Sequence, residues 1–236
     1  VPEPIAIGDT DGLPTDYDII FGSQLMDAEW YLRANPDVLQ TGMGAARHYL
    51  LIGAQENRDP GPLFSSSGYR HANGLTREEN PLLHYLQQRH GSPTAPLPRI
   101  PGRLSGSLPA GKTVLVFAHT SGQTLFGAER SFLAMLERLV RDGFAPVAVL
   151  PGLHNDEYLA QVLEMSAMVE VLPQLWRNGL YPPNTKTVAT IRALIKRYEA
   201  REVHVNTLVL EAPLIAARAE AVPSVVFVRE LPAEDP

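Results

Sequence analysis

From residue 111 onward, short apolar runs alternate with amphipathic segments. Five runs favour β-strands: 113–118, 146–150, 169–172, 202–205 and 224–228. Between them the apolar residues recur at helical spacing and predict four helices, over 128–142, 157–165, 187–200 and 210–221. Continuous apolar strands separated by helices are typical of a parallel sheet with helices on both faces. The pattern therefore predicts a Rossmann-like α/β domain over residues 111–236.

Residues 23–91 have a different pattern and contain a weak internal repeat. Tyr31 and Tyr69 are 38 residues apart, and His48 and His84, each followed by Tyr, are 36 apart. Each copy is typical of two short helices whose aromatic residues face inward, which predicts a small α-helical repeat domain. No cluster of metal-ligating side chains surrounds either histidine in the sequence, so packing or hydrogen bonding is the expected role rather than metal binding.

Two segments lack periodicity. Residues 1–22 mix Pro, Gly and Asp and are expected to form an extended tail. Residues 92–110 are rich in proline, which is stiff and cannot join a helix or a central strand. We therefore expect a linker at 92–110 and a domain boundary within it.

A strand, a Gly-bearing loop and a helix follow one another between residues 114 and 141, and such a helix start binds anions. The dinucleotide fingerprint is absent, because the loop supplies only Gly122 and Gly127 and no acidic residue ends the second strand. The nucleotide-triphosphate loop is absent as well, because Ala128 and Glu129 stand where Lys and Ser/Thr are required. An ordinary turn without a ligand remains an alternative.

Composition narrows the function classes. The 236 residues carry a net charge of −6, which argues against nonspecific nucleic-acid binding. Cysteine is absent, so disulfides and thiolate metal sites are excluded, as suits a reducing cytosol. No apolar run approaches the roughly 20 residues that span a bilayer.

Several short motifs together resemble a known family. The segment 126–130, Phe-Gly-Ala-Glu-Arg, resembles the Gly-Gly-Ala-Glu-Arg segment of family-4-type GT-B glycosyltransferases, and His-Val-Asn-Thr at 204–207 and the run 223–230 fit its later strands. The repeat is similar to the Tyr-Leu-x-x-Asn-Pro-Asp-Val and His-Tyr-Leu repeats that precede some bacterial cell-surface polysaccharide enzymes.

This resemblance implies a metal-independent enzyme, without a cofactor, that transfers a sugar from a nucleotide-sugar to a glycan or lipid-linked acceptor. It implies that the α/β domain binds the acceptor and that a second Rossmann domain, absent from this chain, holds most of the donor. The chain is then expected to be an acceptor-side fragment that is inactive alone. Its expected location is cytoplasmic, and peripheral association with the inner face of the plasma membrane is compatible with this.

The resemblance also implies a donor-phosphate loop that includes Gly122, Phe126 and Gly127. Gly127 would allow close approach of the diphosphate, and Glu129 would brace the helix start. Phe126 stands at the position of the family's first glycine. Unlike glycine, it cannot adopt every positive-φ conformation.

Further candidates lie at other strand ends. His119 follows the first strand, as a functional or a structural histidine, and Asn206 is expected to hold a sugar hydroxyl or cap a helix. Arg229 and Glu230 stand where many family members have a His. Arg229 is expected to pair with a phosphate or an acidic acceptor, and Glu230 to act as an acceptor-side base or only to hold Arg229.

Two other classes of function stay open. Trp176 to Tyr181 lie in a Pro/Gly-rich loop, where an aromatic flanked by polar groups suits either sugar stacking or a buried lid. The chain could be a non-catalytic binding or scaffolding module of a polysaccharide assembly system. It could also be another Rossmann-layer enzyme, such as an epimerase or dehydrogenase, although the cofactor glycines are missing.

Overall fold

A six-stranded sheet organises the C-terminal half of the computed structural model, which describes residues 15–88, 94–106, 111–122 and 124–228. The strand order is β1-β4-β3-β2-β5-β6, and all neighbours are parallel except β1 and β4. The strands are β1 (Arg99–Pro101), β2 (Thr113–Phe117), β3 (Ala145–Leu150), β4 (Met168–Val171), β5 (Glu202–Val205) and β6 (Ser224–Val226). The predicted Rossmann-like α/β fold is thereby confirmed.

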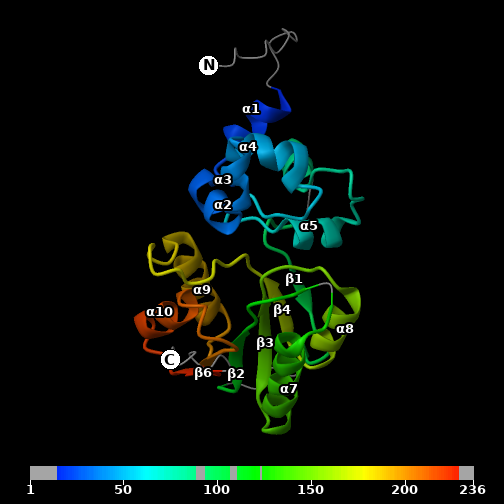
Figure 1. Cartoon of the computed structure of the whole chain (residues 1–236). Helices are drawn as coiled ribbons and strands as arrows, with labels where there is room; N and C mark the ends of the chain where they lie inside the picture. The colour runs from blue at the N-terminus through cyan, green and yellow to red at the C-terminus, as the bar shows by residue number, and fades with distance from the viewer. Residues whose placement is uncertain (1–14, 89–93, 107–110, 123, 229–236) are drawn as a thin grey trace.

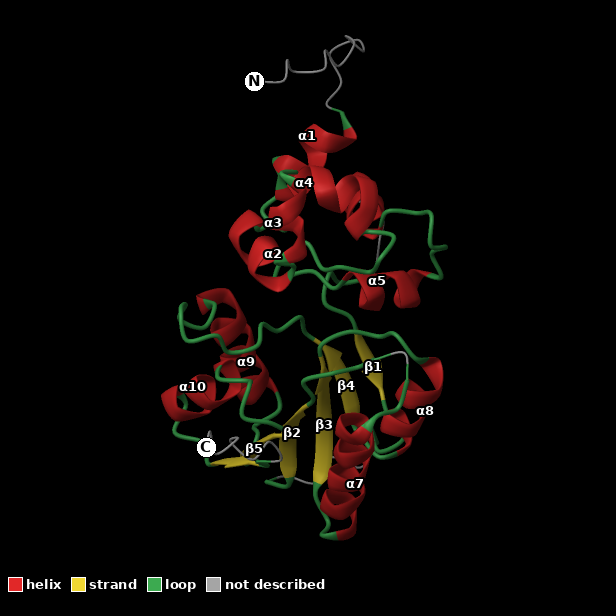
Figure 2. Ribbon diagram, viewed as in Figure 1, coloured by secondary structure: helices red, strands yellow, loops and turns green. Residues whose placement is uncertain are grey.

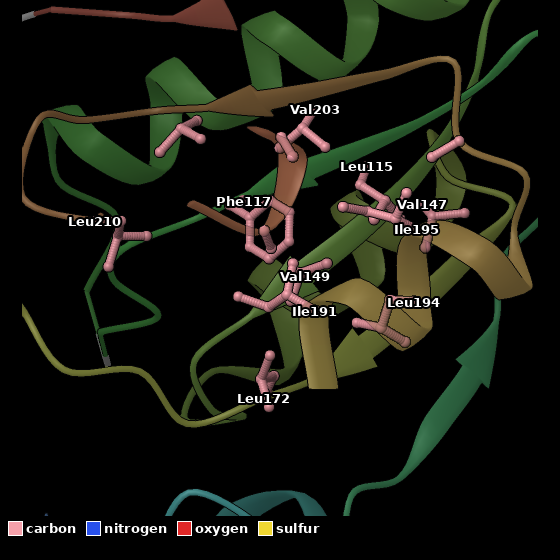
Figure 3. Packing of buried hydrophobic residues seen from close by; sticks show 14 residues of the cluster. Leu115, Phe117, Val147, Val149, Leu172, Ile191, Leu194, Ile195, Val203 and Leu210 are labelled. Atoms are coloured by element: carbon pink, nitrogen blue, oxygen red, sulfur yellow. The ribbon is translucent and has the colours of Figure 1, made fainter. Parts of the chain in front are cut away.

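Helices cover both faces of the sheet, as Figure 2 shows. They are α7 (Gly127–Arg141) and α8 (Asp156–Glu164) on one face, and α9 (Thr185–Arg197) and α10 (Ala212–Ala219) on the other. Side chains alternate along each strand, so Leu115 and Phe117 pack with α9 and α10 (Figure 3), while Val114 and Val116 pack with α7 and α8. β2 and β3 are buried at every position, which explains why both are almost entirely apolar.

Short helices form a separate layer at one end of the sheet (Figure 1). This helical layer has its own core, built on the buried rings of Tyr31, Tyr49, Phe64 and Tyr69. Its elements are α1 (Asp16–Phe21), α2 (Ala28–Ala34), α3 (Asp37–Thr41), α4 (Ala45–His48), the π-helix η1 (Tyr49–Gly53), α5 (Ser66–Asn73) and α6 (Pro81–Gln87). No helix in the described part of the chain is long and apolar enough to cross a membrane.

Equivalent residues of the two sequence copies make equivalent hydrogen bonds. The hydroxyl of Tyr31 lies 2.9 Å from Nδ1 of His48, and the hydroxyl of Tyr69 lies 3.0 Å from Nδ1 of His84. The expected hydrogen-bonding role of these histidines is confirmed. His48 is also buried, which lowers its pKa and keeps the ring neutral near pH 7.

The predicted extended tail is wrong for its last residues. Asp16–Phe21 form α1, because Thr15 and Asp18 make a reciprocal capping box and Ile20 is buried in the helical layer. A helix of fewer than two turns is too short to show helical periodicity in the sequence. Residues 1–14 lie outside the described residues.

The Pro-rich segment contacts both layers. The carbonyl of Pro96 accepts a hydrogen bond from the N–H of Ser65, and the carbonyl of Pro98 accepts one from Val171. Residues Arg99–Pro101 form β1 at the edge of the sheet, where a proline is tolerated because one side needs no donor. Residues 89–93 and 107–110 of the predicted linker lie outside the described residues.

Substitution of Gly102 tests how firmly this segment is held on the sheet. A β-carbon at Gly102 would lie 2.1 Å from the carbonyl oxygen of Ser166, whereas one at Gly106 would meet nothing within 4 Å. We expect Gly102→Ala to lower the free energy of unfolding by about 1–3 kcal/mol, the usual cost of overpacking. Urea unfolding measures the change, with Gly106→Ala as the control. Equal stability of the two variants would show that the segment is not fixed there.

Candidate functional site

A cavity of about 380 Å³ lies at the carboxyl edge of the sheet, between the α/β domain and the helical layer. We call it the edge cavity. The loops after β2, β3 and β4 supply one wall, formed by residues 119–122, Pro151, His154 and Gln174. The helical layer supplies the other, including Trp30, Asn35, Asn57, Arg58 and Asp59. A cavity at this edge fits the general position of ligand sites in open α/β sheets.

Polar contacts hold the helical layer against this edge. Oδ2 of Asp27 lies 2.9 Å from Nζ of Lys186 on α9, and its Oδ1 accepts a hydrogen bond from the N–H of Trp30 as the cap of α2. Partial burial opposes the charge of Asp27, but Lys186 and the Trp30 N–H outweigh it and lower the pKa of the carboxyl. Oγ of Ser67 accepts a further hydrogen bond from the N–H of Leu153, at 2.9 Å.

The loop between β2 and α7 is organised by one buried carboxylate. Glu129 is 3% exposed and accepts hydrogen bonds from the N–H groups of Gly122 and Phe126, at 3.3 and 3.1 Å. Burial opposes its ionisation, but these bonds, together with one from the Thr120 side chain, hold the pKa of Glu129 below its usual range. The expectation that Glu129 braces the helix start is confirmed.

This arrangement reduces the number of backbone amides that the predicted phosphate loop can offer to a ligand. A carboxylate already uses two of the amides, so part of the anion-binding capacity of the loop is satisfied within the chain. Phe126 is 68% exposed and has φ of −93°, so its backbone needs no glycine. Gly127 starts α7 with open space where a side chain would stand, and its role in close approach of a diphosphate stays a prediction.

The predicted site residues fall into three groups. His119 and Gly122 line the edge cavity, and the carbonyl of His119 accepts a hydrogen bond from Nε1 of Trp176 at 3.2 Å. Asn206 is 1% exposed and donates from Nδ2 to the carbonyl of Ala128, so in this structure it holds the start of α7 rather than lining the edge cavity. Residues 229 and 230 lie outside the described residues.

Sequence reasoning missed the wall contributed by the helical layer. Asp59 lies between the two sequence copies, and its Oδ1 accepts a hydrogen bond from the N–H of Ser66 at 2.7 Å. Burial raises the pKa of Asp59 to about 8, although the hydrogen bond from Ser66 favours the charged form. The polar run 57–59 was the available signal, but nothing in the sequence shows that it faces His119 across a cavity.

The edge cavity thus combines proton-transfer groups with hydrogen-bonding side chains. His119, His154 and Asp59 can exchange protons, and Trp30 and Gln174 offer an indole N–H and an amide. Within the described residues no group of three His, Cys, Asp or Glu side chains is placed to hold a metal ion. These groups match a ligand rich in hydroxyls.

Comparison with known proteins does not assign the chain to a family. No family model and no curated protein matches the chain. One solved structure that it resembles is a glycosyltransferase from Rickettsia africae ESF-5, with 16% identity and a TM-score of 0.33. The similarity covers 48% of this chain and 28% of that one, so the chain spans well under a third of its neighbour.

Removal of the Glu129 charge tests its role in the β2–α7 loop. We expect Glu129→Gln to lower the free energy of unfolding by about 1–3 kcal/mol at pH 7, because charged hydrogen bonds in a buried loop are lost. Glu137→Gln, on the exposed side of α7, is the control. The folded pKa of Glu129 is depressed, so its contribution is present above the unfolded pKa and is lost as the pH falls through the folded pKa. A deficit that persists unchanged in acid would contradict this assignment.

Proposed function

We propose that this chain is the acceptor-side part of a GT-B glycosyltransferase, which transfers a sugar from a nucleotide-diphosphate sugar to a glycan or lipid-linked acceptor. The observation that carries the proposal is the edge cavity, which brings Asp59, His119 and His154 together at the carboxyl edge of the sheet. The Phe-Gly-Ala-Glu-Arg segment at 126–130 supports it, because it opens α7 beside this edge. The proposed location is cytoplasmic, at the inner face of the plasma membrane.

The proposed chemistry assigns a role to each side of the site. The acceptor hydroxyl lies in the edge cavity and forms a bond to the anomeric carbon of the donor, while the bond from that carbon to the diphosphate oxygen breaks. His119 takes the hydroxyl proton, with Glu230 as the second candidate base. The negative charge ends on the nucleoside diphosphate, where the amides that open α7 at Gly127 and Ala128 stabilise it without a metal or cofactor.

A second candidate function is a non-catalytic binding or scaffolding module of a polysaccharide assembly system. The position of Glu129 favours it, because its carboxylate already occupies the amides of Gly122 and Phe126 and repels a second anion. In this case the edge cavity binds a glycan and no donor approaches α7.

Binding to the chain separates these functions. The probes are UDP-, GDP- and dTDP-sugars, the methyl glycosides of glucose, galactose, mannose and rhamnose, and NAD, each followed by protein-observed NMR. Glycoside-induced shifts at the edge cavity are expected under both functions, and nucleotide-sugar shifts at the start of α7 only under the transferase. Binding of NAD instead would favour another Rossmann-layer enzyme, and silence toward every sugar would overturn the proposal.

Substitution of Gly127 tests the donor side. A carboxylate at this position would face the diphosphate, so we expect Gly127→Asp to reduce donor-dependent turnover of the complete enzyme by at least about a hundredfold, as loss of such charge stabilisation does elsewhere. Gly127→Ala is the control, because open space surrounds Gly127 and the added methyl group carries no charge. Unchanged turnover in the Asp variant would remove the phosphate-loop assignment.

A further inference from the structure

Two more cavities continue the edge cavity along α2. A middle cavity of about 360 Å³ lies between α2 and the start of the β4–α9 loop, and shares Ala34 and Gln174 with the edge cavity. An outer cavity of about 380 Å³ follows and shares Arg33 and Asn178 with the middle one. The three cavities form one row, which we call the α2 groove.

Exposed aromatic rings stand in the outer part of this groove. Trp176 lines the middle cavity and is 56% exposed, and Tyr181 lines the outer cavity and is 49% exposed. The guanidinium of Arg33 lies 4.7 Å from the centre of the Tyr181 ring, so one face of that ring is already covered. Large apolar rings with polar neighbours suit the C–H faces and hydroxyls of sugar rings.

The wall between the edge and middle cavities carries an unsatisfied amide. Neither Oε1 nor Nε2 of Gln174 has a hydrogen-bond partner, although both atoms are buried, and Nε1 of the buried Trp30 in the edge cavity lacks one as well. Buried polar groups are nearly always paired, so these atoms point to a ligand that supplies the missing bonds. Because an amide both donates and accepts, hydroxyl groups match it.

Charge along the groove excludes a polyanion. Arg58 pairs with Asp37 and Glu56 at 2.8 and 2.7 Å, and Arg177 pairs with Glu211 at 2.8 Å. Arg33 lies 3.8 Å from Glu29 and donates to the carbonyl of Pro182. These cations are already neutralised, so the groove offers hydrogen bonds and ring faces rather than net positive charge.

We propose that the α2 groove binds a chain of uncharged sugars, with one sugar unit in each of the three cavities. The inference rests on the proposed function and deepens it: the acceptor is a growing neutral polysaccharide rather than a single sugar on a lipid. The repeat domain then selects acceptors by chain length, because α2 forms one wall of all three cavities.

Chain-length dependence of binding tests this inference. The full chain is titrated with neutral gluco-, manno-, galacto- and rhamno-oligosaccharides of one to six units, with a heparin hexasaccharide as the polyanion. We expect affinity in one series to rise at each step up to three units and then to level off. Equal affinity for one unit and six, or tighter binding of heparin, overturns the inference and leaves the proposed function standing. Failure of every series to bind overturns both.

Variants of Trp176 separate stacking from a structural role. We expect Trp176→Ala to weaken binding of the trisaccharide about tenfold, the effect typical of a tryptophan at the centre of a binding site. Trp176→Phe keeps a ring but loses the bond to the His119 carbonyl, and should retain most of the affinity. Phe21→Ala is the control, because this exposed ring on α1 lines none of the three cavities. Equal losses in the Phe and Ala variants would show that Trp176 only positions His119.

For Gln174→Met, we expect stability and sugar affinity to change in opposite directions. The side chain keeps its length but loses the unsatisfied amide, so we expect the midpoint of thermal unfolding to rise while affinity for the trisaccharide falls. A lower midpoint would mean that the amide has partners within the protein. An unchanged affinity would remove Gln174 from the groove.

Discussion

Docking of the helical layer onto the carboxyl edge of the sheet is the interaction on which the candidate site depends. Helices cover both faces of the sheet, so the edge is the place where loops of the α/β domain can meet a further layer. The ion pair of Asp27 with Lys186, the bond from Leu153 to Ser67 and the bond from Arg33 to the Pro182 carbonyl hold that layer in place. Without it Trp30, Arg58 and Asp59 would not face His119, and the edge cavity would be an open surface.

Glu129 shows a competition between stability and anion binding in the β2–α7 loop. Its carboxylate satisfies amides that would otherwise stay unpaired at a helix start, and its negative charge favours the positive end of α7. The same charge raises the energy of a phosphate at that end. In the proposed transferase, the donor diphosphate would therefore approach the amides of Gly127 and Ala128 rather than enter the loop itself.

The α/β domain could be predicted from sequence because its strands and helices follow local patterns. Strand β5 has the predicted bounds, and β2 and β3 differ from theirs by one residue. In β2 and β3, burial on both faces gives a nearly continuous apolar run. Helix α1 could not be predicted, because it is stabilised by the Thr15 cap and by burial of Ile20 in a layer formed later in the chain. The cavity wall at Asp59 could not be predicted for the same reason, because contacts between layers leave no periodic pattern in the sequence.

The edge cavity does not lie where the strand order alone would place a ligand site. In an open α/β sheet the order reverses at one point, here between β2 and β5, and a crevice is expected outside the strand ends there. Asn206 lies at this point, but its buried amide is bonded to the first turn of α7. The edge cavity instead lies over β2, β3 and β4, on the side where α2 provides a second wall. The helical layer therefore sets where a ligand can bind, and the sheet sets only the edge.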